Sequence, residues 1–320
     1  MVDLKIYLEN YYEAQFDELG FVNYNKRFKD HPCNIYIIGG RPRVIIDPDY
    51  LEYDNKKVEL LFKVQDGYDY RPIKGHIPLE REVKGKLSIE SDFPHSRFNL
   101  IDEAGYHFHG TEYQNKKDLK LKAGYALRIS LPENEWDSVY DLEVYYIGQS
   151  LRMNKKISPV VRLKSHNKFQ HVLDKCVSNY IDKEVYIILC SFVAKIGLSA
   201  TGDEVRQLED VTEFLQKAQS EGEQIKKDTK LITDLAEAAL IDYFNTNEFN
   251  KDFIGSFGNK SHKYYKQIAS SLIDILSVEI DLNNLCRVYS STISPSRHHG
   301  LKFEVKNNFK REYWSAEIKG

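Results

Sequence analysis

The feature that most constrains the fold of this chain is a short apolar and aromatic run that ends in glycine. Residues 144–150 read VYYIGQS, which is typical of a buried strand that closes on a tight turn. Further on, Arg162 and His166 are four residues apart, so on a helix both side chains project from one face. Later still, Glu237 begins the run EAALI, which favours a helix that carries a carboxylate. A tyrosine, an arginine, a histidine and a carboxylate are the residue types that metal-assisted phosphate chemistry requires.

The totals of the chain limit its class. With 320 residues there is room for two or three domains, and 42% hydrophobic with 12% aromatic residues excludes wholesale disorder. A net charge of −3 excludes a general basic coat, so contact with DNA or RNA has to be local. No run approaches the ~20 apolar residues of a membrane span and the first residues do not resemble a signal peptide, so we expect no membrane association. The chain has four cysteines without paired spacing, Cys33, Cys176, Cys190 and Cys286. This spacing argues against a zinc site and against disulfides, and it favours a reducing cytoplasm.

Apolar periodicity predicts the elements of the chain. The first part is expected to hold a helix over residues 1–20, followed by a mostly β module that opens with a hairpin. That hairpin joins residues 34–38 and 42–46 around Gly39-Gly40. Two antiparallel strands are expected next, at residues 124–129 and 142–149, followed by a helix at 159–180 and a buried strand at 184–192. A second helix is expected at 264–276, and three closing strands at 287–293, 300–305 and 313–318.

Charge divides the second half of the chain. Residues 151–200 hold nine Lys/Arg against three Asp/Glu, whereas residues 201–250 hold five against twelve, so phosphate contact is expected in the first block. Residues 203–226 predict an extra acidic helix, which is either a solvated helix or a surface that binds a protein partner. Residues 297–299 (RHH) predict an exposed basic loop, either merely solvated or in contact with nucleic acid.

Taken in order, residues 146–150 (YIGQS), Arg162 with His166, residues 237–241 (EAALI) and Phe249-Asn250 resemble the GIY-YIG nuclease domain family. Members of that family are built as two strands, a helix, a third strand and further helices. The resemblance covers roughly residues 120–252.

The resemblance implies an α+β fold with a central GIY-YIG-like three-stranded sheet and helices. A β-rich N-terminal module and a small α/β C-terminal region flank this sheet. The expected domains are an N-terminal helix plus β-rich module at residues 1–118, a nuclease-like domain at 119–254 with the acidic helix inserted, and a C-terminal helix and strands at 255–320.

The chemistry assigns a role to each residue of the set. Glu237 is expected to hold Mg²⁺ (or Mn²⁺), a cation that prefers oxygen ligands and keeps most of its waters. Arg162 would grip two phosphate oxygens, and His166 would orient the phosphate or the attacking water. Tyr146 would carry a hydroxyl that orients water or accepts its proton. Gly148 and Asn250 are auxiliary, with Asn250 expected to hold the backbone of the site.

Two departures from the family's pattern bear on activity. The family has a second tyrosine, from a Gly-Ile-Tyr triplet on the first strand, where this chain reads Gly124-Tyr125-Ala126. Either that strand is shifted and Tyr125 serves, or the hydroxyl is missing, since a one-residue slip turns a side chain to the opposite face. The proline expected before Asn250 is also absent, and residues 245–247 read NTN.

Two functions follow as hypotheses. The first is a Mg²⁺-dependent endonuclease that cuts DNA, expected to be double-stranded, with residues 1–118 choosing the target. A restriction, anti-phage defence or mobile-element setting is compatible with it. The alternative is a non-catalytic module of the same fold that binds nucleic acid or a protein partner. The set Arg162, His166 and Glu237 favours the enzyme, whereas the altered triplet and the acidity of the chain favour the module.

Overall fold

The computed structural model describes residues 1–19, 33–108, 120–132, 135, 137–149, 167–198, 211–246, 249–250 and 263–316. The chain is α+β and forms two compact units. The core unit comprises Met1–Gly40, Leu142–Cys176 and Val185–Gly320, and the inserted unit comprises Arg41–Asp141 and Val177–Glu184. This division differs from the three consecutive domains expected from the sequence, because both ends of the chain contribute to one unit.

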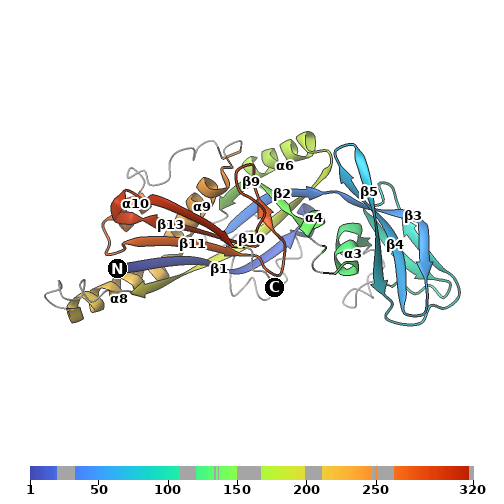
Figure 1. Ribbon diagram of the computed structural model, residues 1–320, viewed down its shortest axis with the longest axis horizontal. Helices are drawn as coiled ribbons and strands as arrows, with labels where there is room; N and C mark the ends of the chain where they lie inside the picture. Colours follow the sequence, from blue (N-terminus) through green and yellow to red (C-terminus); the bar gives the residue numbers. More distant parts are fainter. Residues whose placement is uncertain are drawn as a thin grey trace. The chain divides into compact units, whose positions relative to one another are not determined.

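The core unit is organised around a large sheet. Among the described residues it has eight strands in the order β12-β9-β2-β10-β1-β11-β13-β14 (Figure 1). Their bounds are β1 Val2–Ala14, β2 Ile35–Pro42, β9 Leu142–Gln149, β10 Lys183–Leu198, β11 Ile275–Asp281, β12 Val288–Tyr289, β13 His298–Glu304 and β14 Lys310–Ala316. The strands predicted at residues 142–149 and 184–192 are confirmed, and closing strands lie in the predicted C-terminal stretch.

The first residues form a strand, so the helix predicted over residues 1–20 is wrong. Val2, Leu4 and Ile6 are fully buried and alternate with less buried neighbours, which is the period of a strand. β1 pairs antiparallel with β10 and parallel with β11, so a sheet covers both of its edges. The short 3₁₀ helix η1 (Phe16–Glu18) follows it.

The hairpin predicted around Gly39-Gly40 is also wrong. β2 continues through both glycines and pairs antiparallel with β9, more than a hundred residues later, with Tyr36 opposite Gly148. The following strand, β3 (Val44–Tyr53), pairs instead with β4 (Lys57–Asp66), in a separate sheet. The chain between β2 and β9 is most of the inserted unit.

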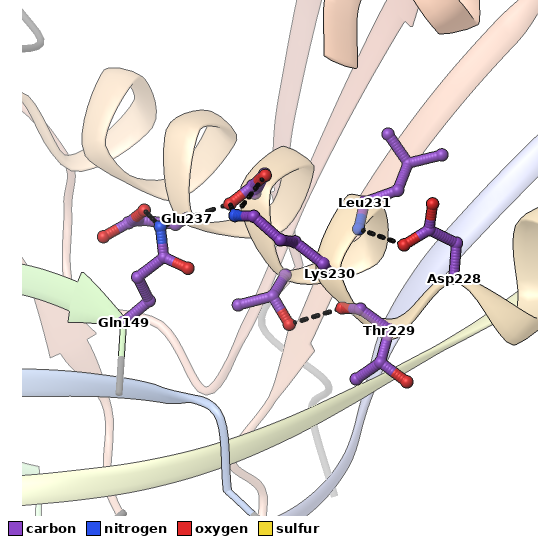
Figure 2. Close-up of polar contacts among 8 residues, drawn as sticks. Gln149, Asp228, Thr229, Lys230, Leu231 and Glu237 are labelled. Atoms are coloured by element: carbon purple, nitrogen blue, oxygen red, sulfur yellow. Dashed lines mark hydrogen bonds and ion pairs between the residues drawn. The ribbon is translucent and has the colours of Figure 1, made fainter. Parts of the chain in front are cut away.

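Helices accompany the core sheet. They are α6 (Asn167–Asn179), α8 (Val211–Lys227), α9 (Thr229–Phe244) and α10 (Lys263–Ala269). α9 packs on β9 and also contacts α8, α10 and β11, which explains why nearly all of its positions are buried. Its N-terminus is capped by Asp228, whose carboxylate accepts the backbone N–H of Leu231 at 2.9 Å (Figure 2). α10 ends earlier than predicted because β11 begins at Ile275.

Among its described residues, the inserted unit holds two sheets and two short helices. β3, β4 and β5 (Asp69–Pro78) form one sheet, and β6 (Leu87–Ser91), β7 (Arg97–Asp102) and β8 (Leu121–Lys122) form the other. The strand predicted at residues 124–129 is wrong, because helix α3 (Ala123–Ser130) occupies this segment and packs on β3 and β5. Ala123, Ala126 and Leu127 are buried at helical spacing, so this segment has one apolar face and not two. The short helix α4 (Asp137–Tyr140) precedes β9.

The predicted exposed basic loop at residues 297–299 is wrong for its last two residues, because β13 begins at His298. His299 lies in β13 and is fully buried. One ring nitrogen accepts the hydroxyl of Tyr243 at 2.9 Å, and the other lies 2.9–3.0 Å from the carbonyl oxygens of Ser296 and Val288. Burial lowers the pKa of His299 to about 4, so the ring is neutral at physiological pH. In the part of the chain that the structure describes, no helix combines the length and apolar character needed to span a bilayer.

Candidate functional site

Two tyrosines from neighbouring strands meet over a glycine at the end of β9. The ring centroids of Tyr36 in β2 and Tyr146 in β9 are 5.9 Å apart, and Phe169 of α6 packs edge-on against Tyr36 at 5.8 Å. A methyl group on Gly148 would lie 2.7 Å from a ring carbon of Tyr146 and from the hydroxyl oxygen of Tyr36. Only glycine therefore allows both rings to close over this point of the strand.

Asn250 holds the outer edge of β9 beside this glycine. Its side-chain amide donates to the carbonyl oxygen of Ile147 at 2.8 Å, and its side-chain oxygen accepts the N–H of Ile147 at 3.2 Å. Thr246 donates its hydroxyl to the same oxygen of Asn250 at 2.9 Å. Asn250 is buried, and its amide group makes the pair of hydrogen bonds that a neighbouring strand would otherwise make.

α9 brings a carboxylate to the last residue of β9. The side-chain amide of Gln149 donates to Glu237 at 2.8 Å and to Asp234 at 3.2 Å (Figure 2). Lys230, one turn earlier on the helix, donates to both oxygens of Asp234 at 2.9 Å. The helical spacing places Lys230, Asp234 and Glu237 along one side of α9, which faces the end of the strand.

The environment of Glu237 disfavours its charge. Glu237 is only 5% exposed, and burial raises its pKa to about 7, with a further upward contribution from the negative charge of Asp234. The hydrogen bond from Gln149 opposes this rise. Burial also raises the pKa of Tyr264 in α10, and the charges of Asp234 and Glu237 add to that rise, so its hydroxyl lies within their field.

The tyrosines and the carboxylate reach the end of β9 from different sides. Side chains alternate along a strand, so Tyr146 and Gly148 share one face, whereas Gln149 belongs to the other. The backbone N–H of Gln149 also hydrogen-bonds to Glu237, which places this carboxylate near the strand itself. The site is therefore the end of β9, with aromatic rings over one face and Glu237 beside its last residue.

The structure brings together some of the residues predicted from the sequence. Tyr146, Gly148, Glu237 and Asn250 all lie within or against the last four residues of β9. Tyr125 lies elsewhere, on α3 of the inserted unit, with 55% of its surface exposed.

Other predicted and unpredicted residues complete the account. Arg162 and His166 lie outside the described residues. Sequence reasoning missed Gln149 and Tyr36. The signal for Tyr36 was Asn34-Ile35-Tyr36, a triplet that differs from Gly-Ile-Tyr only by asparagine in place of glycine.

Glu237 is the candidate ligand for a hard divalent cation at this site. Within the described ranges, no three His, Cys, Asp or Glu side chains are grouped as metal ligands. Mg²⁺ binds through one or two carboxylates together with substrate phosphates and keeps several waters, so a single carboxylate is compatible with such a site. A cation bound at Glu237 would offset the burial and the negative charge of Asp234, both of which raise the pKa of this carboxyl group. Comparisons with protein-family models, curated proteins and solved structures return no match for this chain.

Proposed function

We propose that this chain is a metal-dependent endonuclease of the GIY-YIG type that hydrolyses phosphodiester bonds in double-stranded DNA. The observation that carries the proposal is the pair Tyr36 and Tyr146, packed over Gly148 on adjacent antiparallel strands. The family uses two such tyrosines, one from each strand. In this proposal Tyr36 supplies the second hydroxyl in place of Tyr125, and Asn34 takes the place of the first glycine of the triplet.

The order of elements supports the same proposal. β2 and β9 are the two strands, α6 is the helix, β10 is the third strand, and α8 and α9 are the helices that follow. β2 lies between β9 and β10 in the sheet. If β2 is taken as the first strand in place of residues 124–129, the elements follow the order of the family: two strands, a helix, a third strand and further helices. The inserted unit then occupies the connection between the first two strands.

The proposed chemistry divides the work among the residues of the site. A divalent cation on Glu237 would supply Lewis acidity at the phosphate. Lys230 already neutralises Asp234, which leaves Glu237 as the carboxylate of this pair for the cation. The hydroxyls of Tyr36 and Tyr146 would orient water or accept its proton, and Arg162 and His166 would bind the phosphate.

The target would be chosen outside the core unit. We assign this role to the inserted unit, whose β3–β4–β5 sheet replaces the N-terminal module of residues 1–118 as the candidate for recognition. A cytoplasmic restriction, anti-phage or mobile-element role is compatible with such a division, and residues of α8 remain candidates for a protein partner.

Cleavage of plasmid DNA tests the proposal. The protein is incubated with supercoiled plasmid in Mg²⁺, in Mn²⁺ and in EDTA. We expect cleavage that requires the metal and that disappears in Glu237→Gln. Tyr36→Phe should lower the rate by about 100-fold or more, in the range typical of lost acid–base groups. Tyr125→Phe is the matched comparison, and we expect it to cleave at the wild-type rate.

Two results would contradict the proposal in different ways. If Tyr125→Phe lost cleavage and Tyr36→Phe kept full activity, Tyr125 of the inserted unit would be the second tyrosine of the site, and Tyr36 would not. A folded wild-type protein that cleaves neither DNA nor RNA, yet binds DNA in a salt-sensitive manner, would favour the non-catalytic module.

A further inference from the structure

Gln149 has a contact pattern that the proposed chemistry does not use. It is the last residue of β9, and its side-chain nitrogen donates to Glu237 at 2.8 Å and to Asp234 at 3.2 Å (Figure 2). An amide nitrogen carries two hydrogens, and these two carboxylates account for both. The side chain therefore connects the strand with two positions of α9.

The second carboxylate serves as a fixed point. Asp234 accepts both of its strong contacts from Lys230, at 2.9 Å to each oxygen, on the same helix. This i, i+4 ion pair favours the orientation of Asp234 in which both of its oxygens accept from Lys230. Gln149 donates one hydrogen bond to Asp234 and a second to Glu237, so its amide is oriented by the first contact when it makes the second. The hydrogen bond from Gln149 therefore limits the side-chain conformations that Glu237 can adopt.

We propose that Gln149 is a positioning residue that orients the Glu237 carboxylate for a divalent cation. This inference rests on the metal role proposed for Glu237. Groups that hydrogen-bond to a metal ligand set its orientation, and their loss typically weakens metal affinity by about 10–100-fold. Gln149 does so from the last position of β9, the strand that also carries Tyr146.

Binding of Mn²⁺ alone to the full-length protein tests the proposal, without DNA. The dissociation constant is measured by calorimetry and by the loss of the free Mn²⁺ paramagnetic resonance signal. We expect Gln149→Leu to weaken binding by about tenfold or more. Gln219→Leu, the same replacement at an exposed position of α8, is the matched control and should bind as the wild type does. Thermal unfolding of each variant is recorded in parallel.

A double-mutant cycle separates positioning from a general structural effect. Glu237→Asp keeps a carboxylate that can bind Mn²⁺ but shortens it by one methylene, out of reach of the Gln149 amide. If Gln149 acts through Glu237, Gln149→Leu should weaken Mn²⁺ binding by less than about twofold in the Glu237→Asp background. A full tenfold loss in both backgrounds would overturn the proposal, since Gln149 would then act on the fold and not on this carboxylate.

The remaining outcomes are also decisive. Equal Mn²⁺ affinity in Gln149→Leu and Gln219→Leu overturns the positioning role and leaves the nuclease proposal standing. Absence of Mn²⁺ binding to the wild-type protein overturns the positioning role as well. Plasmid cleavage by the same samples tests the nuclease proposal independently. If the wild type shows the expected double-mutant cycle in Mn²⁺ affinity but does not cleave plasmid, the nuclease proposal fails and the metal site stands.

Discussion

The buried carboxyl group of Glu237 should make the stability of the metal-free protein depend on pH. Its pKa rises from the usual 4.5 to about 7, because burial and Asp234 disfavour the charged form. Folded protein therefore holds the proton at pH values where the unfolded chain has lost it. The stabilisation is fully present below about pH 4.5 and is lost as the pH rises through about 7. A difference of roughly 2.5 pKa units corresponds to about 3 kcal/mol.

Glu237→Gln isolates this effect, since the amide has the size of the acid and does not titrate. We expect the free energy of unfolding of the wild type, relative to Glu237→Gln, to fall by about 3 kcal/mol between about pH 4.5 and about pH 8. Urea denaturation in EDTA, followed by circular dichroism, measures both proteins across this range. Glu82→Gln, at an exposed position, is the control and should follow the wild type. Parallel pH curves for wild type and Glu237→Gln would refute the reasoning, because Glu237 would then not hold its proton in the fold.

Three further predictions concern residues around the site and in the core. Gly148→Ala should destabilise the protein by about 1–3 kcal/mol in urea denaturation, because the added methyl group would meet the hydroxyl of Tyr36; unchanged stability would contradict this packing. Asn250→Ala should cost about 2–4 kcal/mol in the same assay, since both backbone groups of Ile147 lose their partner, and a cost under about 1 kcal/mol would mean that water replaces it. The pKa of His299 is lowered to about 4, so the free energy of unfolding should fall by about 3 kcal/mol as the pH falls from about 6.5 through about 4. Urea denaturation of His299→Gln should not show this fall. An equal fall in His299→Gln would mean that other groups cause the pH dependence.

The elements predicted well are those whose signal lies within the element itself. Residues 144–147 of β9 and residues 185–190 of β10 are continuous apolar and aromatic runs, which is the pattern of strands buried on both faces. α9 has an alanine- and leucine-rich sequence, and the structure confirms the helix. Local composition is enough in such cases, because neither assignment requires knowledge of the partner.

The failures arise where a distant partner decides the conformation. Residues 1–20 have apolar positions compatible with a helix, but β1 is flanked by β10 and β11, and these strands come from the middle and the end of the chain. The sequence predicts a strand at residues 124–129, with residues 142–149 as its antiparallel partner. The actual neighbour is β2, so the segment was free to form α3. Tyr36 was missed for the same reason.

Gly39 and Gly40 show how one local interpretation caused this error. Two adjacent glycines between apolar runs usually mark a turn, and that interpretation paired residues 34–38 with residues 42–46. In the structure both glycines lie inside β2, where β9 approaches too closely for side chains. A methyl group on Gly39 would lie 2.5 Å from the carbonyl oxygen of Glu143, and one on Gly40 would lie 2.5 Å from the hydroxyl oxygen of Tyr145. The register between the strands also shifts beside Gly39, as expected at a bulge.

This explanation can be tested with two replacements of the same kind. Gly39→Ala should destabilise the protein by about 1–3 kcal/mol in urea denaturation, because the backbone of β9 has to move. Gly197→Ala, in β10, is the matched control: its methyl group would meet nothing closer than 3.7 Å, so its cost should stay within about 0.5 kcal/mol. If the two variants were equally stable, Gly39 would be a turn residue after all. The pairing of β2 with β9 would then lose its physical reason, and Tyr36 would lose its place beside Tyr146.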